Sequence, residues 1–273
     1  AQASLILCLT FLFTAGHAQI AWYSLLLTSV WVFSGGWIQK NVKNAFAALG
    51  QLVLSAGCAA ILSSVQLFPT FEYLLQSQRS SSVDFDTAMT YSFWPWRFLT
   101  FLAPQIFGNP ALGNYWGYAA YWEDAVYIGV LPILLVLVGS VWWIFGRKEK
   151  GKNIYSRRYL YIVLFLIIGL ALLLALGNNT QIYPFLYEHV PTFDMFNSPT
   201  RFMLPVVFSL AILAGLLSDN WVKPTGAALY WARLGTVGMI AVIITALMSG
   251  EYLYGIQPTI RKAFMQTGVL ALI

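Results

Sequence analysis

Long apolar runs separated by short polar segments dominate the chain. Several runs approach the roughly 20 residues that a helix rising about 1.5 Å per residue needs to cross a hydrocarbon core of about 30 Å. The predicted spans are residues 1–15, 20–35, 45–68, 125–146, 159–176, 202–217 and 234–249. The pattern therefore predicts an all-α fold, a polytopic transmembrane helical bundle with about seven spans.

Two helix ends are predicted from local sequence. Read as one helix, residues 4–37 would measure about 50 Å, which is too long for a single span. The chain should therefore break near Gly16, giving two short spans or two half-helices that meet at a polar tip. Pro69 is expected to close the third span, because proline removes a backbone donor from a helix interior.

Composition agrees with a membrane protein. Only 9% of the residues are charged and 59% are hydrophobic, whereas a soluble domain is typically about 25% charged. The net charge of +5 comes from basic residues clustered in short loops, which argues against nucleic acid as a partner. We expect one membrane domain, residues 1–273, that is a fragment of a longer chain, because the sequence begins without Met inside an apolar run.

Charge asymmetry sets the predicted orientation. The segment 147–158, RKEKGKNIYSRR, holds six Lys or Arg against one Glu, and the positive-inside rule places it in the cytoplasm. Alternating the spans then puts residues 69–124 outside as one long external loop. This loop is rich in aromatics, with prolines and glycines that favour short interfacial helices over one long helix. Its aromatic faces belong to an interface belt or stack on a sugar ring or lipid carrier.

Carboxylates in and beside this loop are the candidate catalytic groups. Asp84-Phe85-Asp86 is a DxD triplet, which acts as a base or cation ligand in some enzymes or is simply a solvated loop. Glu123 precedes a span, where it caps the helix or acts as a general acid or base with a raised pKa. Glu72 is a further external acid.

Arginines and one polar break are the candidate binding groups. A guanidinium fork suits bidentate capture of phosphate, which makes Arg79 and Arg201 phosphate candidates, although Arg201 at a span end is also placed to snorkel. His17 and Gln19 lie at the predicted break, where near-membrane polar groups need partners. With only two histidines and no HExxH pattern, no metal site is predicted.

Five fragments taken together resemble YfhO-type bacterial membrane proteins, relatives of polytopic GT-C-type glycosyltransferases that use lipid-linked sugars. They are AGHAQ (15–19), LFPTFEYLLQSQRSS (67–81), APQIFGNP (103–110), EDAVYIGVLPILL (123–135) and FNSPTRFMLP (196–205). The resemblance implies a bundle with an external site that passes sugar from a polyprenyl phosphate to a cell-envelope acceptor. It also implies a main catalytic carboxylate in a loop upstream of Ala1.

In that family pattern, supporting or substrate-binding roles fall on His17, Arg79, Glu123, Tyr127 and Arg201, whereas Asp84-Phe85-Asp86 lies outside it. We therefore expect a glycosyltransferase-like protein, multi-pass in the bacterial cell membrane, that uses no cofactor. Its partners would be membrane lipids, a polyprenyl-phosphate sugar and a cell-envelope polymer.

The predicted site residues fall into two groups. The catalytic set is Glu123, Asp84 and Asp86, and the substrate-binding set is His17, Gln19, Glu72, Arg79, Tyr127 and Arg201. Two alternatives stay open: a transporter or flippase of an envelope lipid-linked precursor, and a non-catalytic envelope-assembly protein. Ion-coupled transport is disfavoured because the runs 159–176 and 234–249 contain no charge.

Overall fold

The computed structural model describes residues 2–38, 41–77, 83–101, 104, 106–117, 121–145, 154–222, 230, 233–238, 240 and 241. Every regular element in this described part is a helix, so the predicted all-α class is confirmed. The longer helices are α1 (Gln2–Thr14), α2 (Ala18–Ile38), α3 (Val42–Leu62), α4 (Ser64–Gln76), α7 (Val130–Phe145), α8 (Ile154–Ala175) and α10 (Met203–Val222). The short ones are α5 (Phe85–Met89), α6 (Tyr121–Asp124) and α9 (Ile182–His189), with 3-10 helices η1 (Pro95–Phe101), η2 (Pro110–Leu112), η3 (Gly177–Asn179), η4 (Phe193–Met195) and η5 (Pro199–Phe202).

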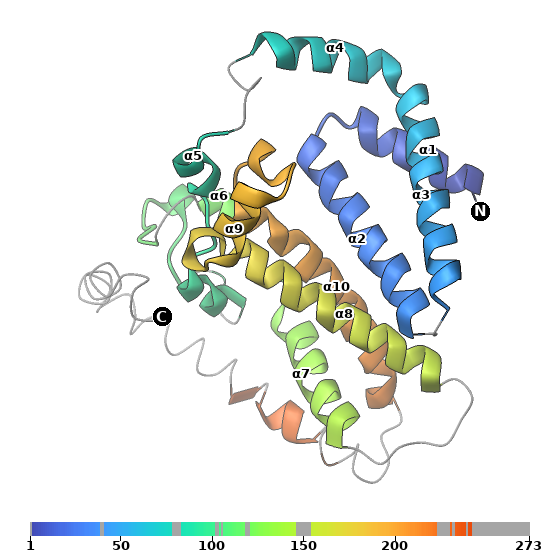
Figure 1. The fold of residues 1–273 in the computed structure, drawn as a ribbon. Helices are drawn as coiled ribbons and strands as arrows, with labels where there is room; N and C mark the ends of the chain where they lie inside the picture. The colour runs from blue at the N-terminus through green and yellow to red at the C-terminus, as the bar shows by residue number, and fades with distance from the viewer. Residues whose placement is uncertain are drawn as a thin grey trace.

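The long helices form two groups. Helix α3 packs against α1 and α2, while α10 packs against α7 and α8, and α2 contacts α8 between the groups (Figure 1). The main core lies around α8 and α10, where Leu164, Val206 and Leu213 are fully buried. Gly139 of α7 lets the Leu217 side chain of α10 approach its backbone closely.

Three helical segments in the described residues are long and apolar enough to cross a membrane: Val42–Leu62, Arg158–Ala175 and Pro199–Ser218. Two shorter apolar segments, Gln2–Thr14 and Val130–Ser140, fall below that length. The predicted span 234–249 falls largely outside the described residues, as does most of the basic segment 147–158. The structure thus supports a helical membrane protein with three candidate spans among the described residues, and the seven predicted spans are not confirmed.

The two predicted helix ends have different outcomes. The break near Gly16 is confirmed, because α1 ends at Thr14, α2 begins at Ala18, and Gly16 has a φ of 76°. The prediction that Pro69 ends the third span is wrong, since Pro69 lies inside α4. The helix turns earlier, at Ser63, whose hydroxyl donates to the Thr10 carbonyl of α1 at 3.2 Å.

The start of the fourth predicted span also differs from the expectation. Helix α7 begins only at Val130, after Gly129 at a φ of 99°, so residues 125–129 are not helical. The left-handed backbone at Gly129, which glycine adopts at low cost, separates the short helix α6 from α7.

The short helices gather at one end of the bundle, where Figure 1 shows α5, α6 and α9 together. Backbone hydrogen bonds join the loop after α5 to its neighbours: the Phe93 N–H donates to the Ala175 carbonyl of α8 at 2.9 Å, and the Thr200 N–H of η5 donates to the Tyr91 carbonyl at 3.0 Å. Beside them the Arg97 guanidinium is buried over the Phe107 ring. The prolines predicted to prevent one long helix do so, since η1 and η2 begin at Pro95 and Pro110.

Candidate functional site

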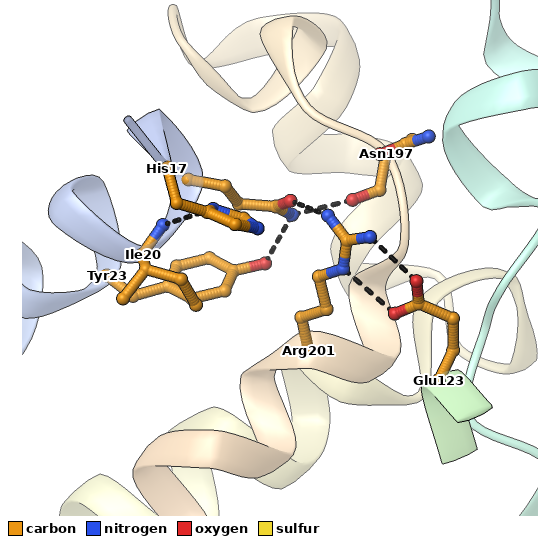
Figure 2. A network of polar contacts seen from close by, with 7 residues as sticks. His17, Ile20, Tyr23, Glu123, Asn197 and Arg201 are labelled. Carbon is orange, nitrogen blue, oxygen red and sulfur yellow. Dashed lines mark hydrogen bonds and ion pairs between the residues drawn. The ribbon is translucent and has the colours of Figure 1, made fainter. Parts of the chain in front are cut away.

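A polar network at this end of the bundle joins three elements that are far apart in sequence. Gln19 lies in the first turn of α2, Glu123 in α6 and Arg201 in η5, which leads into α10. Arg201 donates from Nε to Glu123 Oε2 at 2.9 Å and from Nη2 to Glu123 Oε1 at 2.7 Å. Its Nη1 donates to Gln19 Oε1 at 2.6 Å, so the guanidinium lies between the two partners (Figure 2).

Gln19 is the buried polar partner of Arg201, with 4% of its surface exposed. Its amide nitrogen donates to the Tyr23 hydroxyl at 2.8 Å and to the Asn197 carbonyl at 2.6 Å. Tyr23 is four residues later on the same helix, which is the spacing that places two side chains on one helical face. The amide nitrogen and the amide oxygen of Gln19 therefore both have hydrogen-bond partners, and Gln19 helps to fix the orientation of Arg201.

The turn before Arg201 is unusual in its backbone. Ser198 has a φ of 62° and a ψ of 69°, a left-handed conformation that is uncommon for a residue with a Cβ. Pro199 follows as the first residue of η5, and the Arg201 N–H donates to the Ser198 carbonyl at 3.0 Å. Ser198 is fully buried, and its hydroxyl has no hydrogen-bond partner among the described residues. This turn directs the Asn197 carbonyl toward Gln19 and starts the segment that carries Arg201.

The electrostatics of Glu123 correct two predictions. Hydrogen bonds from Arg201 hold the pKa of the Glu123 carboxyl below its ordinary value, outweighing the opposing effect of partial burial, and the charges of Arg201 and His17 act in the same direction. The expected raised pKa is therefore wrong. The capping interpretation is also wrong, because α7 begins at Val130 and the carboxylate binds Arg201 instead.

His17 lies beside this network at the tip between α1 and α2. Its side chain is exposed, and its Nδ1 accepts from the Ile20 N–H at 3.3 Å, which satisfies a backbone donor in the first turn of α2 (Figure 2). His17 and Gln19, the two polar residues at the break, therefore each have hydrogen-bond partners within the protein.

The remaining predicted residues lie apart from the network. Asp84 and Asp86 are exposed at the start of α5, Glu72 is exposed on α4, and Tyr127 is exposed in the segment after α6. No hydrogen bond or ion pair joins these four side chains to Gln19, Glu123 or Arg201 within the described ranges. Arg79 lies outside the described residues. Where residues are described, no group of three or more His, Cys, Asp or Glu could hold a metal ion.

Sequence reasoning missed two members of the network, Tyr23 and Asn197. The spacing of Gln19 and Tyr23 is a signal that could have been used, since residues four apart face the same way on a helix. The Asn197 carbonyl carries no such signal, because a backbone group 178 positions away is brought to Gln19 only by the tertiary fold.

The regular elements in the described part of the chain are all helices, some of them candidate membrane spans, and a partly exposed polar network around Arg201 lies at one end. Comparison with known proteins adds no relative: no family model, no curated protein and no solved structure matches the chain.

Proposed function

We propose that the chain belongs to a multi-pass membrane glycosyltransferase of YfhO type in the bacterial cell membrane. It would take sugar from a polyprenyl-phosphate donor and transfer it to a cell-envelope acceptor at the external face. One observation carries this proposal: Arg201 is held in a fixed orientation at the end of the candidate span Pro199–Ser218, with about a quarter of its side chain exposed. A lipid-embedded donor presents its phosphate at this depth, where the hydrocarbon core meets the headgroups.

The hydrogen bonds of Arg201 leave room for such a ligand. A guanidinium has five N–H groups, and three of them donate to Glu123 and Gln19. The other two, one on each terminal nitrogen, form no bond with the described residues. Fixed donors of this kind stabilise charge that develops on a leaving group, because they need little reorganisation during reaction.

Glu123 has a supporting role in this proposal. A carboxylate with a lowered pKa is a weaker base than an unperturbed one, so Glu123 orients Arg201 and the transferred proton goes elsewhere. In the transfer itself, the bond from the sugar C1 to the phosphate oxygen breaks and a bond from C1 to the acceptor oxygen forms. The phosphate leaves with the bonding electrons, and the acceptor proton passes to a carboxylate base, for which Asp84 and Asp86 stay candidates.

A second candidate function is a non-catalytic envelope-assembly protein. The observation that favours it is the extent to which the network is satisfied internally: Arg201 ties α2, α6 and η5 together through three short hydrogen bonds. Such an arrangement also serves as a structural clamp, whose removal lowers stability without affecting any chemistry.

A transfer assay with full-length protein and a labelled polyprenyl-phosphate sugar separates these functions. We expect Arg201→Gln to lower turnover by about 100-fold, the effect of removing one fixed donor to a developing anion. The matched control is Arg158→Gln, which alters an exposed arginine in the first turns of α8 and should leave turnover unchanged. If wild-type protein transfers no sugar and Arg201→Gln lowers only the melting temperature, the result would support a purely structural role for Arg201 and contradict the proposed glycosyltransferase activity.

A further inference from the structure

Helix α4 leaves the axis of a candidate membrane span. Helix α3 has 21 residues, or about 31 Å at 1.5 Å per residue, which matches a hydrocarbon core of about 30 Å. At Ser63 the chain turns, and Figure 1 shows α4 running across the end of the bundle instead of continuing along α3. If α3 spans the bilayer, α4 begins where the span reaches the membrane surface.

The side chains of α4 divide into an apolar and a polar face. At 3.6 residues per turn, five large apolar residues fall in an arc of about 120°; they are Leu67, Phe68, Phe71, Leu74 and Leu75, whereas Val65 and Pro69 lie outside this arc. Residues of the opposite arc are mostly polar: Gln66, Thr70, Glu72, Tyr73 and Gln76. None of the residues of α4 is buried. Within the apolar arc, Phe68 is 74% exposed, Phe71 59% and Leu75 58%.

The end of α3 that precedes α4 is apolar and exposed. Ile61 and Leu62, in the last turn of that candidate span, are both exposed. On a membrane-spanning helix such side chains face lipid, so α4 follows directly on a lipid-facing end of the span. Glu72 is the one charged residue of α4, so apolar burial and not charge attraction would drive the contact.

Pro69 is compatible with this position. Inside a helix proline leaves the carbonyl four residues earlier without its usual donor. Pro69 is exposed and lies on the polar side of α4. At a membrane surface, water or headgroups can donate to a freed carbonyl, which the hydrocarbon core cannot do.

We propose that α4 is an in-plane membrane helix that lies at the boundary between headgroups and acyl chains and inserts Phe68, Phe71 and Leu75 toward the acyl chains. The bilayer surface is the partner, and the polar face of α4 is turned to water. An amphipathic helix with a low net charge binds lipid in this way through its buried apolar area. The inference is independent of glycosyl transfer.

Spin-label accessibility in nanodiscs tests this placement. The full chain, with Cys8 and Cys58 replaced by Ala, receives single cysteines at Phe68, Phe71 and Leu75, with matched controls at Gln66 and Tyr73 on the opposite face. The label sites are exposed, and tryptophan fluorescence of each labelled protein checks folding. We expect collision with oxygen to dominate at the first three positions and collision with a water-soluble nickel complex at the two controls, with one shared depth for the three apolar sites.

Three results would overturn the proposal. Depth that increases steadily from residue 66 to residue 75 would make α4 part of a span. Nickel access at every position would place the apolar face in water. Protection of the apolar positions from both reagents would mean that protein, a second copy or another subunit, covers the face. A label at Ile61, at the end of α3, gives the oxygen signal of a lipid-facing site for comparison.

Discussion

Replacing Glu123 with Gln removes the charge of the central ion pair and keeps the size of the side chain. The two side chains are 26% and 28% exposed and share hydrogen bonds of 2.7 and 2.9 Å. Breaking a fully buried pair costs about 3 to 5 kcal/mol, and an exposed pair is worth about 0 to 1 kcal/mol. We expect an intermediate loss of about 2 kcal/mol, and a melting temperature lower by about 5 °C.

The effect should depend on pH in a defined direction. The pKa of Glu123 is lowered in the folded protein, whereas in the unfolded chain it returns to about 4.3. Between these two values the unfolded state binds more protons, so stability rises with pH there. The contribution of Glu123 is fully present above about pH 4.3 and is lost as the pH falls through the folded pKa. The difference between wild type and Glu123→Gln should therefore be present at neutral pH and shrink in acid.

Thermal unfolding followed by tryptophan fluorescence measures this difference. Glu188→Gln is the matched control, because Glu188 is exposed on α9 and a surface change of this kind stays within about 0.5 kcal/mol. A double-mutant cycle with Arg201→Gln should give a coupling free energy of about 1 to 2 kcal/mol. Additive effects of the two substitutions, or a loss no larger than that of the control, would refute the ion pair as a stabilising contact.

Two further predictions concern close approaches to glycine. Gly177→Ala should lower the melting temperature strongly, because Gly177 has a φ of 51° and an added Cβ would clash with the Ser92 hydroxyl oxygen. A melting temperature equal to wild type would contradict the described packing. Gly139→Ala should cost about 1 to 3 kcal/mol through overpacking against Leu217. Gly169→Ala is the control, because an added Cβ at Gly169 meets nothing within 4 Å, and it should be neutral or stabilising in the same melting assay. Equal losses of stability in Gly139→Ala and Gly169→Ala would show that contact with Leu217 does not cause the loss at Gly139.

Much of the helical architecture could be predicted from the sequence. Apolar runs of membrane length indicate helices without any knowledge of tertiary contacts, and the polar tip at Gly16 indicates a break. The prediction that a helix ends at Pro69 is wrong for a physical reason. Proline disfavours a helix interior, but the chain turns at Ser63, whose hydroxyl donates to the Thr10 carbonyl. This contact joins residues 53 positions apart, so local sequence does not reveal it.

The candidate site could be predicted only in part. Gln19, Glu123 and Arg201 are conspicuous because each is a polar residue beside an apolar run, yet their pairing depends on how α2, α6 and η5 meet. The pKa of Glu123 shows the consequence. A raised pKa is predicted for this carboxyl beside an apolar run, but burial of Glu123 raises its pKa less than the hydrogen bonds from Arg201 lower it.

The central claim is that Arg201 binds the phosphate of a lipid-linked donor. Phosphorus-31 NMR of a polyprenyl monophosphate in nanodiscs with full-length protein tests it directly. We predict a saturable shift of the phosphate resonance with wild type and with Arg158→Gln, and its loss with Arg201→Gln that remains folded by fluorescence. An equal shift with Arg201→Gln, or no shift with wild type, would contradict the claim.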